Sequence, residues 1–251
     1  MGREQDTATN RGIQAVGLVL LPAIWIAVKY LAAPPDRFLP SITRVGQAAF
    51  EVEPALWSHV GATLLRLCFG FTIGVLSGIA LGIALARSQR LSFLLTPSVQ
   101  ALRAVPPTAT VPFFLLWFGF SEFGRMLLLC LGTALNVAVA TLEAVSAVPE
   151  RYAVLFRSVR RSPADFAVAY LLPVAVERLL PTLRVTLASC FGLELVSELL
   201  GSQLGLGYLL QSARTTLAMH TIFLVAIILG IINTILDAAL RRAWCRLIFW
   251  R

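Results

Sequence analysis

Six segments of this 251-residue chain are long and apolar enough to cross a membrane, because about 20 apolar residues span the bilayer as a helix. They cover residues 13–33, 56–86, 95–119, 123–147, 173–200 and 219–240. In lipid, backbone polar groups must be hydrogen-bonded within a helix or a closed barrel. We therefore predict an all-α polytopic membrane protein with about six transmembrane helices, forming one transmembrane domain over residues 1–251.

Two of the six segments depart from a simple span. The first resembles a signal peptide, but its apolar run continues past Tyr30 without a clean cleavage site, so we predict an uncleaved span. The third is interrupted by Arg103 and by Pro106, Pro107 and Pro112. Prolines are tolerated in a span where neighbouring helices satisfy the freed carbonyl groups, and we predict that this segment crosses as well.

The composition agrees with a membrane protein and argues against nucleic-acid binding. The chain is 58% hydrophobic and 14% charged, whereas soluble domains are about 45–50% apolar and about a quarter charged. Its net charge of +8 comes from arginines that flank apolar segments, as topology determinants do. A nucleic-acid interface would instead gather them on one soluble face.

The distribution of basic residues predicts the orientation in the membrane. Twelve of them fall at the two termini and in the loops on the same side, and four fall in the opposite loops: Arg37, Arg44, Arg125 and Arg214. The positive-inside rule therefore places both termini in the cytoplasm. The loops 34–55, about 120–125 and 201–218 are then external.

Four glycines follow one another at intervals of four residues in the second predicted span: Gly70, Gly74, Gly78 and Gly82. This spacing places them on one face of a helix, where another backbone can approach closely. The pattern favours helix packing, with a hinge or pore-lining role as the alternative.

Several polar residues fall within predicted spans. Glu194 and Glu198 share one face of the fifth span, four residues apart. Charged groups at such depth avoid lipid and mark functional hypotheses. The glutamates fit a polar face near the interface, the lining of a central cavity, or an ion relay. Together with Arg66 and Asn136, we assign them to a translocation path or gate.

The cysteines and histidines predict no metal site and no catalytic centre. Cys68, Cys130, Cys190 and Cys245 form no CxxC pair, and the two histidines lie far apart. A free cysteine in an apolar run behaves as a small hydrophobic residue.

A basic segment near the middle of the chain, ERYAVLFRSVRRSPADF (150–166), differs from its apolar surroundings. An apolar stripe from Tyr152 to Val159 has helical spacing, and Ser162-Pro163 can begin a second short helix. Two short cytoplasmic helices would form a knob that another protein could bind. The alternatives are a helix lying on the membrane surface and a plain topology signal.

Further motifs along the chain resemble a known family. His59-x-x-x-Thr63-Leu64-x-Arg66 enters the second span, and the third contains Val105-Pro106-Pro107 and Trp117-Phe118-Gly119, followed by Glu122. Later come Leu172-Pro173, Leu183-Arg184, Glu198 and Leu204-Gly205-Leu206-Gly207-Tyr208. In this order and spacing, the motifs resemble the permease subunits of bacterial ABC importers, specifically the nitrate/sulfonate/taurine-type branch of the binding-protein-dependent family.

The resemblance implies a type I importer permease of the bacterial inner membrane, which moves a small solute such as a sulfonate, taurine or nitrate inward. It implies a second permease subunit in a homodimer, two ATPase subunits and a periplasmic or lipid-anchored solute-binding protein. ATP and Mg would be bound by the ATPase, since this chain has no G-x-x-x-x-G-K-[ST] phosphate loop and is not itself an enzyme. The segment of about 148–173 would be the coupling loop, contacting the ATPase through Arg157, Ser158, Val159, Arg160, Arg161, Ser162, Pro163 and Asp165.

The chain departs from the family pattern at two positions. Arg160 stands where the coupling loop usually has a glycine, and Glu177 replaces the second proline of a Leu-Pro-x-x-x-Pro pattern. Arginine disfavours the positive-φ conformation that glycine allows and adds a positive charge. We therefore expect either a matching acidic surface on the ATPase or a different mode of coupling between this subunit and the ATPase.

Three other functions compete with an importer. A secondary transporter or channel would show inverted repeats and paired broken helices. An intramembrane enzyme would need a catalytic constellation inside the spans, and none is present in the sequence. A scaffold agrees less well with the polar residues in the spans.

Overall fold

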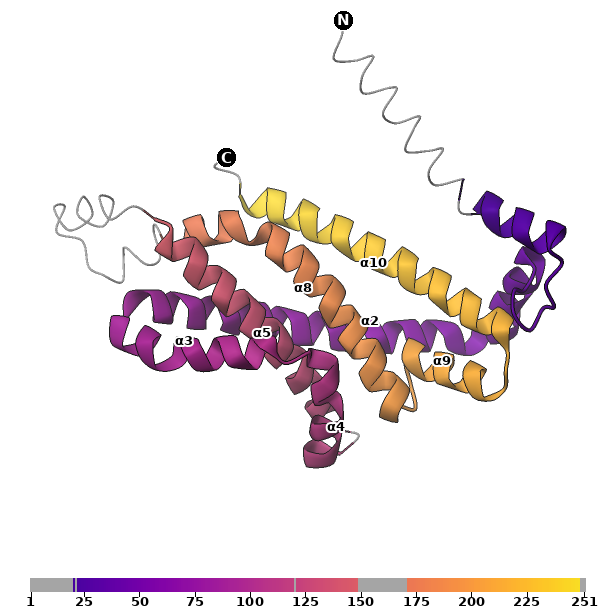
Figure 1. The fold of residues 1–251 in the computed structure, drawn as a ribbon, viewed down its shortest axis with the longest axis horizontal. Helices are drawn as coiled ribbons and strands as arrows, with labels where there is room; N and C mark the ends of the chain where they lie inside the picture. The colour runs from indigo at the N-terminus through magenta and orange to yellow at the C-terminus, as the bar shows by residue number, and fades with distance from the viewer. Residues whose placement is uncertain (1–19, 21, 120, 149–170, 249–251) are drawn as a thin grey trace, which may run out of the picture. The chain divides into compact units, whose positions relative to one another are not determined.

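The computed structural model describes residues 20, 22–119, 121–148 and 171–248, and every regular element among them is helical (Figure 1). After a short apolar helix, Pro22–Leu31, the chain forms the long helix α2 (Ile42–Arg87) and then α3 (Gln89–Ala104), α4 (Pro107–Phe118) and α5 (Glu122–Ser146). The remaining helices are α8 (Leu172–Gly201), α9 (Leu206–Thr215) and α10 (Met219–Leu247).

The chain divides into two compact units. One comprises residues 1–56 and 210–228, and the other comprises residues 57–209 and 229–251. The expectation of one transmembrane domain over the whole chain stays a prediction. The predicted coupling residues, Arg157 to Asp165, lie outside the described residues.

The predicted spans agree with the helices at most positions. The helices Ala55–Arg87, Glu122–Ser146, Leu172–Gly201 and Met219–Arg246 are long and apolar enough to cross a membrane, and they confirm four of the six predicted segments. The pair α3 and α4 would make a fifth span. Residues 13–19 and 21 of the first predicted span, 13–33, lie outside the described residues, and its described part forms the short helix Pro22–Leu31, which is not long enough to be counted among the spans. The segments 34–55 and 201–218, predicted as external loops, also contain helix, namely the start of α2 and most of α9.

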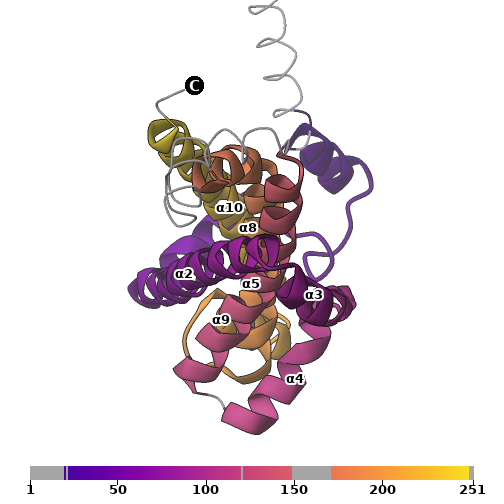
Figure 2. The ribbon, with the colours of Figure 1, turned by 90° about the vertical axis from the view of Figure 1, so that its left-hand side faces the viewer.

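The third predicted span is not one straight helix but two helices that meet at 97° (Figure 2). The break follows from Pro106 and Pro107, because proline disfavours the α conformation of the residue before it and lacks an amide hydrogen. Val105 is accordingly extended (φ −72°, ψ 125°), and its N–H donates to the Leu102 carbonyl. Pro107 then begins α4, where a missing N–H costs no helical hydrogen bond.

The four glycines of α2 face α5. A Cβ built at Gly74 would lie 2.6 Å from the Thr133 Cβ and 2.8 Å from the Cys130 carbonyl oxygen. At Gly78 it would lie 2.7 Å from the Ala134 carbonyl oxygen. The two backbones therefore approach more closely than any side chain on α2 would allow.

The larger unit has its apolar core around α5 and α8, which run beside each other (Figure 1). Fully or largely buried side chains from α2, α4, α5 and α8 form this core, including Leu67, Val111, Leu129 and Leu193. Apolar residues of α10 pack against the same core. The core thus holds the helices that carry the polar residues described below.

The smaller unit is built on aromatic packing. The Trp25 indole donates to the Pro40 carbonyl oxygen (3.1 Å) and packs against the Phe223 ring, 5.1 Å between centroids. Nearby, the Lys29 ammonium donates to Asp36 Oδ1 (2.7 Å), and this hydrogen bond lowers the pKa of the Asp36 carboxyl.

Arg184 and Asp237 form an ion pair between the spans α8 and α10. Arg184 Nε and Nη2 donate to the two carboxylate oxygens of Asp237 at 2.6 and 2.9 Å. Two parallel hydrogen bonds of this kind are among the stronger charge-assisted contacts. The sequence motifs include Arg184 but gave no indication of its partner.

We expect Asp237→Asn to lower the thermal stability of the purified protein, because one neutral oxygen cannot accept both bonds from the guanidinium. The melting temperature in detergent measures the effect. Arg242, an exposed arginine of the same helix that forms no ion pair with Asp237, supplies the control substitution Arg242→Gln. Equal melting temperatures for the two variants would show that the pair does not stabilise the α8–α10 contact.

Candidate functional site: a buried polar cluster

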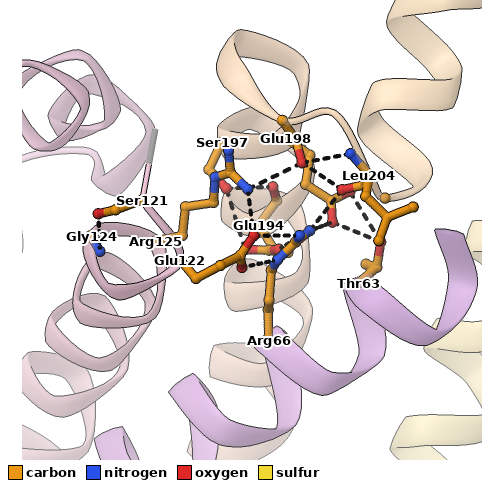
Figure 3. Close-up of polar contacts among 12 residues, drawn as sticks. Thr63, Arg66, Ser121, Glu122, Gly124, Arg125, Glu194, Ser197, Glu198 and Leu204 are labelled. Carbon is orange, nitrogen blue, oxygen red and sulfur yellow. Dashed lines mark hydrogen bonds and ion pairs between the residues drawn. The ribbon is translucent and has the colours of Figure 1, made fainter. Parts of the chain in front are cut away.

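Three helices and one connecting segment bring their polar groups to one place, which we call the polar cluster (Figure 3). It contains His59, Thr63 and Arg66 of α2, Glu122 and Arg125 of α5, Glu194, Ser197 and Glu198 of α8, and the segment Ser202–Gly207. Most of its members are buried; Arg66 is 5% exposed, and Glu194 and Glu198 are fully buried.

Arg66 is the central cation of the polar cluster. Its Nη1 donates to Glu198 Oε1 (2.9 Å) and to the Leu204 carbonyl oxygen (2.8 Å). Its Nε and Nη2 donate to the two carboxylate oxygens of Glu122, the latter at 2.8 Å. The planar, forked guanidinium allows this side chain to bind three groups at once.

Glu198 holds the segment that follows α8. The Thr63 hydroxyl donates to both carboxylate oxygens of Glu198 at 2.8 and 3.0 Å, and the Gly207 N–H donates to Oε2 at 2.8 Å. The same Thr63 oxygen accepts from the Leu206 N–H (2.9 Å). The buried carboxylate thus satisfies the Gly207 N–H directly, and the Thr63 hydroxyl that it binds satisfies the Leu206 N–H.

Glycine is required where this segment passes over Glu198. Gly205 has φ +133°, a conformation that other residues rarely adopt, and a Cβ there would collide with the Glu198 carboxylate. A Cβ at Gly207 would lie 2.6 Å from the Glu198 Cβ. The Gly205 N–H donates to His59 Nδ1 (2.9 Å), which fixes the turn from the α2 side.

Arg125 joins α5 to the end of α8. Ser121 caps α5, its hydroxyl accepting from the Gly124 N–H (3.2 Å), and this start places Glu122 and Arg125 one turn apart on one face. Arg125 Nη1 donates to Glu122 Oε1 (3.2 Å) and Ser202 Oγ (3.1 Å), and Nη2 donates to the Gly201 carbonyl. Arg125, at 4% exposed, is therefore not the loop residue that the topology count assumed.

The charges of the polar cluster nearly balance. Two guanidinium groups, of Arg66 and Arg125, contact three carboxyl groups, of Glu122, Glu194 and Glu198. Glu194 Oε1 lies 3.8 Å from Arg66 Nη1 and accepts no hydrogen bond from the described residues. Because breaking a buried ion pair leaves an uncompensated charge, this arrangement fixes α2, α5 and α8 to one another and holds the segment after α8.

Asn136 lies apart from the polar cluster. It is 14 residues beyond Glu122 on α5, or about 21 Å along the helix axis at 1.5 Å per residue. Its side-chain amide donates to the Gly132 carbonyl (3.0 Å), and it lines a cavity between α5 and α8. The structure therefore brings together three of the four residues assigned to a path or gate, and that assignment stays a prediction.

Sequence reasoning reached part of the polar cluster. The four-residue spacing of Glu194 and Glu198 indicated a shared face, and Thr63, Glu122 and Gly205–Tyr208 belonged to the family motifs. It missed Arg125 and Ser202 as members. The Glu122–Arg125 spacing was the available signal for Arg125, since residues three apart on a helix are neighbours.

The polar cluster contains carboxylates and a histidine, which are common metal ligands. Among the residues that the structure describes, no group of three or more His, Cys, Asp and Glu side chains is arranged to hold a metal ion. Its groups bind one another and the backbone, so the arrangement serves to hold helices and a loop in place.

Two curated relatives resemble the chain over most of its length. It is 30% identical to the taurine transport system permease protein TauC of Escherichia coli (strain K12), over 93% of this chain and 87% of that protein. It is 29% identical to the putative aliphatic sulfonates transport permease protein SsuC of Bacillus subtilis (strain 168), with the same coverage. These similarities favour an ABC permease over a secondary transporter or channel, and a transport component over an enzyme.

The fold also has a solved counterpart. A chain of the methionine ABC transporter MetNI in an inward-facing conformation matches with a TM-score of 0.61 and 20% sequence identity, over 80% of this chain and 98% of that chain. The profile of a family described as "Binding-protein-dependent transport system inner membrane component" matches residues 74–243. The chain therefore belongs to this family of multi-pass inner-membrane transport components, as its sequence motifs predicted.

Proposed function

We propose that the chain forms the transmembrane pathway of an ATP-driven importer for small organic sulfonates. The observation that carries the proposal is the similarity, over 93% of the chain, to permeases named for taurine and for aliphatic sulfonates. An importer of this kind accounts for the polar residues within the spans, which a scaffold would not need.

The proposed assembly contains two copies of this chain, two ATPase subunits and a solute-binding protein. ATPase and binding-protein partners in general follow from the family, and the pairing of two identical permease subunits is the proposed part. Both termini would face the cytoplasm, in agreement with the excess of basic residues at the termini and in the loops on that side, which is twelve to three once the buried Arg125 is left out. The polar cluster, at the start of α5 and the end of α8, would then lie at the external face.

The sulfonate proposal predicts a specific ligand response of the cognate solute-binding protein. We expect taurine or alkanesulfonates to raise its melting temperature more than nitrate, bicarbonate or aromatic acids do, because a ligand that binds only the folded state stabilises it. Proteoliposomes containing the whole importer should then accumulate the same sulfonate when ATP is supplied to the ATPase. Accumulation of nitrate or an aromatic acid, and not of any sulfonate, would rule out the proposed solute.

The basic segment 150–166 is proposed to contact the ATPase. If Arg160 and Arg161 meet acidic residues there, the double substitution Arg160→Glu and Arg161→Glu should abolish the stimulation of ATP hydrolysis by loaded binding protein. Close charge pairs at interfaces couple by about 1.5 kcal/mol or more, and reversal adds repulsion. Unchanged stimulation in reconstituted complexes would reduce the segment to a topology signal.

A further inference from the structure

A cavity of about 390 Å³ lies between α5 and α8, and none of the residues that line it belongs to the polar cluster. This volume is within the range of about 300–1,000 Å³ that is typical of small-molecule sites. Its walls include Arg103, at the end of α3, Asn136 of α5, and Thr182, Thr186 and Ser189 of α8.

The uncharged polar side chains of this cavity come from one face of α8 and from Asn136 of α5. Thr182, Thr186 and Ser189 are spaced at i, i+4 and i+7, which places their hydroxyls along one face of the helix. Hydroxyl and amide groups donate hydrogen bonds, and a guanidinium has five donors and no acceptor. The Ser189 hydroxyl donates to the Val185 carbonyl oxygen (3.0 Å), and one Asn136 N–H donates to Gly132. The donors that the cavity offers a solute are therefore the Arg103 guanidinium, the other Asn136 N–H and the two threonine hydroxyls.

Arg103 is the cation of the cavity, and among the described residues no carboxylate forms an ion pair with its guanidinium. The other charged lining residue, Glu143, is seven residues from Asn136 on α5, or about 10.5 Å along the axis. Arg103 and Asn136 also line a second cavity, which Glu143 does not. The end at Arg103 and Asn136 therefore attracts anions.

The second cavity, of about 100 Å³, is apolar. Besides Arg103 and Asn136, its wall consists mainly of Leu102, Val105, Leu128, Leu131 and Leu135. No acidic side chain is found among the described residues that line it. An anionic group bound at Arg103 and Asn136 would have donors on one side and hydrocarbon on the other.

We infer that these two cavities form one solute site for alkanesulfonates on the translocation path. The sulfonate group is held by Arg103, Asn136 and Thr186, and the alkyl chain enters the apolar cavity. The inference rests on the proposed function and narrows it. Nitrate has no apolar part to fill the second cavity, and the ammonium group of taurine would lie among leucines without a carboxylate, which is costly.

The test uses the permease bound to its ATPase in nanodiscs, without the binding protein, so that selectivity of the latter does not enter. Equilibrium binding of labelled butanesulfonate is measured for wild type, Arg103→Gln, Arg103→Lys and Arg90→Gln. Arg90 is an exposed arginine on the same helix and serves as the control. We expect Arg103→Gln to weaken binding about tenfold or more, as for loss of a hydrogen bond to a charged group, Arg103→Lys to weaken it less, and Arg90→Gln to have no effect.

A second variant tests the apolar cavity without changing charge. Leu131→Trp adds volume to its wall and should weaken butanesulfonate binding several-fold more than methanesulfonate binding. The inference is overturned by the absence of saturable binding to wild type, by equal binding of butanesulfonate, taurine and nitrate, or by Arg103→Gln behaving like Arg90→Gln. None of these results bears on sulfonate uptake by the intact importer, which remains the separate test of the proposed function.

Discussion

Replacing Arg66 with alanine is expected to remove most of the assembled, folded permease. The substitution would leave the buried carboxylates of Glu194 and Glu198 without their nearest cation, and the Leu204 carbonyl would keep only the Ser202 hydroxyl as a donor. Removing one partner of a buried ion pair costs about 3–5 kcal/mol, which is a large part of the typical stability of about 5–15 kcal/mol. The yield and melting temperature of the purified protein in detergent measure the loss.

Two further variants separate this explanation from a general sensitivity of α2. Arg87→Ala removes an exposed arginine from the last turn of the same helix and should change the melting temperature little. Adding Glu198→Gln to Arg66→Ala should recover part of the loss, because the buried negative charge is then removed as well. If Arg66→Ala melts at the same temperature as Arg87→Ala, the polar cluster does not stabilise the fold.

Placing alanine at Gly74 or Gly78 is expected to separate α2 from α5 and to reduce the assembled protein severely. The added methyl group would meet backbone carbonyl oxygens of α5, of Cys130 in one case and Ala134 in the other, at 2.8 and 2.7 Å. Backbone atoms cannot turn away as a flexible side chain does, so the two helices must move apart. Overpacking of this kind costs about 1–3 kcal/mol at one site, and in lipid the lost contacts are the main attraction between helices.

The matched control is Gly61 on the same helix. A Cβ there meets no atom within 4 Å, and alanine is favoured over glycine within a helix by about 0.5–1 kcal/mol. Gly61→Ala should therefore leave the melting temperature unchanged or raise it, while Gly74→Ala lowers it. If the melting temperature fell equally in both variants, α2 would be sensitive to substitution for reasons other than its contact with α5.

The sequence was sufficient to predict the helices because hydrophobic length is a local property. The predicted spans 123–147 and 173–200 differ from α5 and α8 by one residue at each end. Two consecutive prolines in the sequence mark the bend after Ala104. Because prolines are also tolerated within a span, the sequence alone was equally consistent with one continuous helix. Only packing against neighbouring helices decides between those outcomes.

The polar cluster could be predicted only in part because its contacts join distant residues. Arg66 binds Glu198 across 132 positions, and no periodicity tells which arginine reaches which glutamate. The cavity at Arg103 was equally hidden, because Arg103 appeared only as an interruption of an apolar segment. The family motifs marked Thr63, Glu122 and Gly205 without indicating that they meet, which required the fold.

The bend between α3 and α4 has a consequence for the order in which the protein is built. At 1.5 Å per residue the two helices are about 24 and 18 Å long, so neither alone reaches across a hydrocarbon core of about 30 Å. Both pack against α5, which is synthesised after them. This segment therefore depends on a later part of the chain for its place in the bilayer. Its insertion is completed only once the ribosome has made the residues up to Ser146.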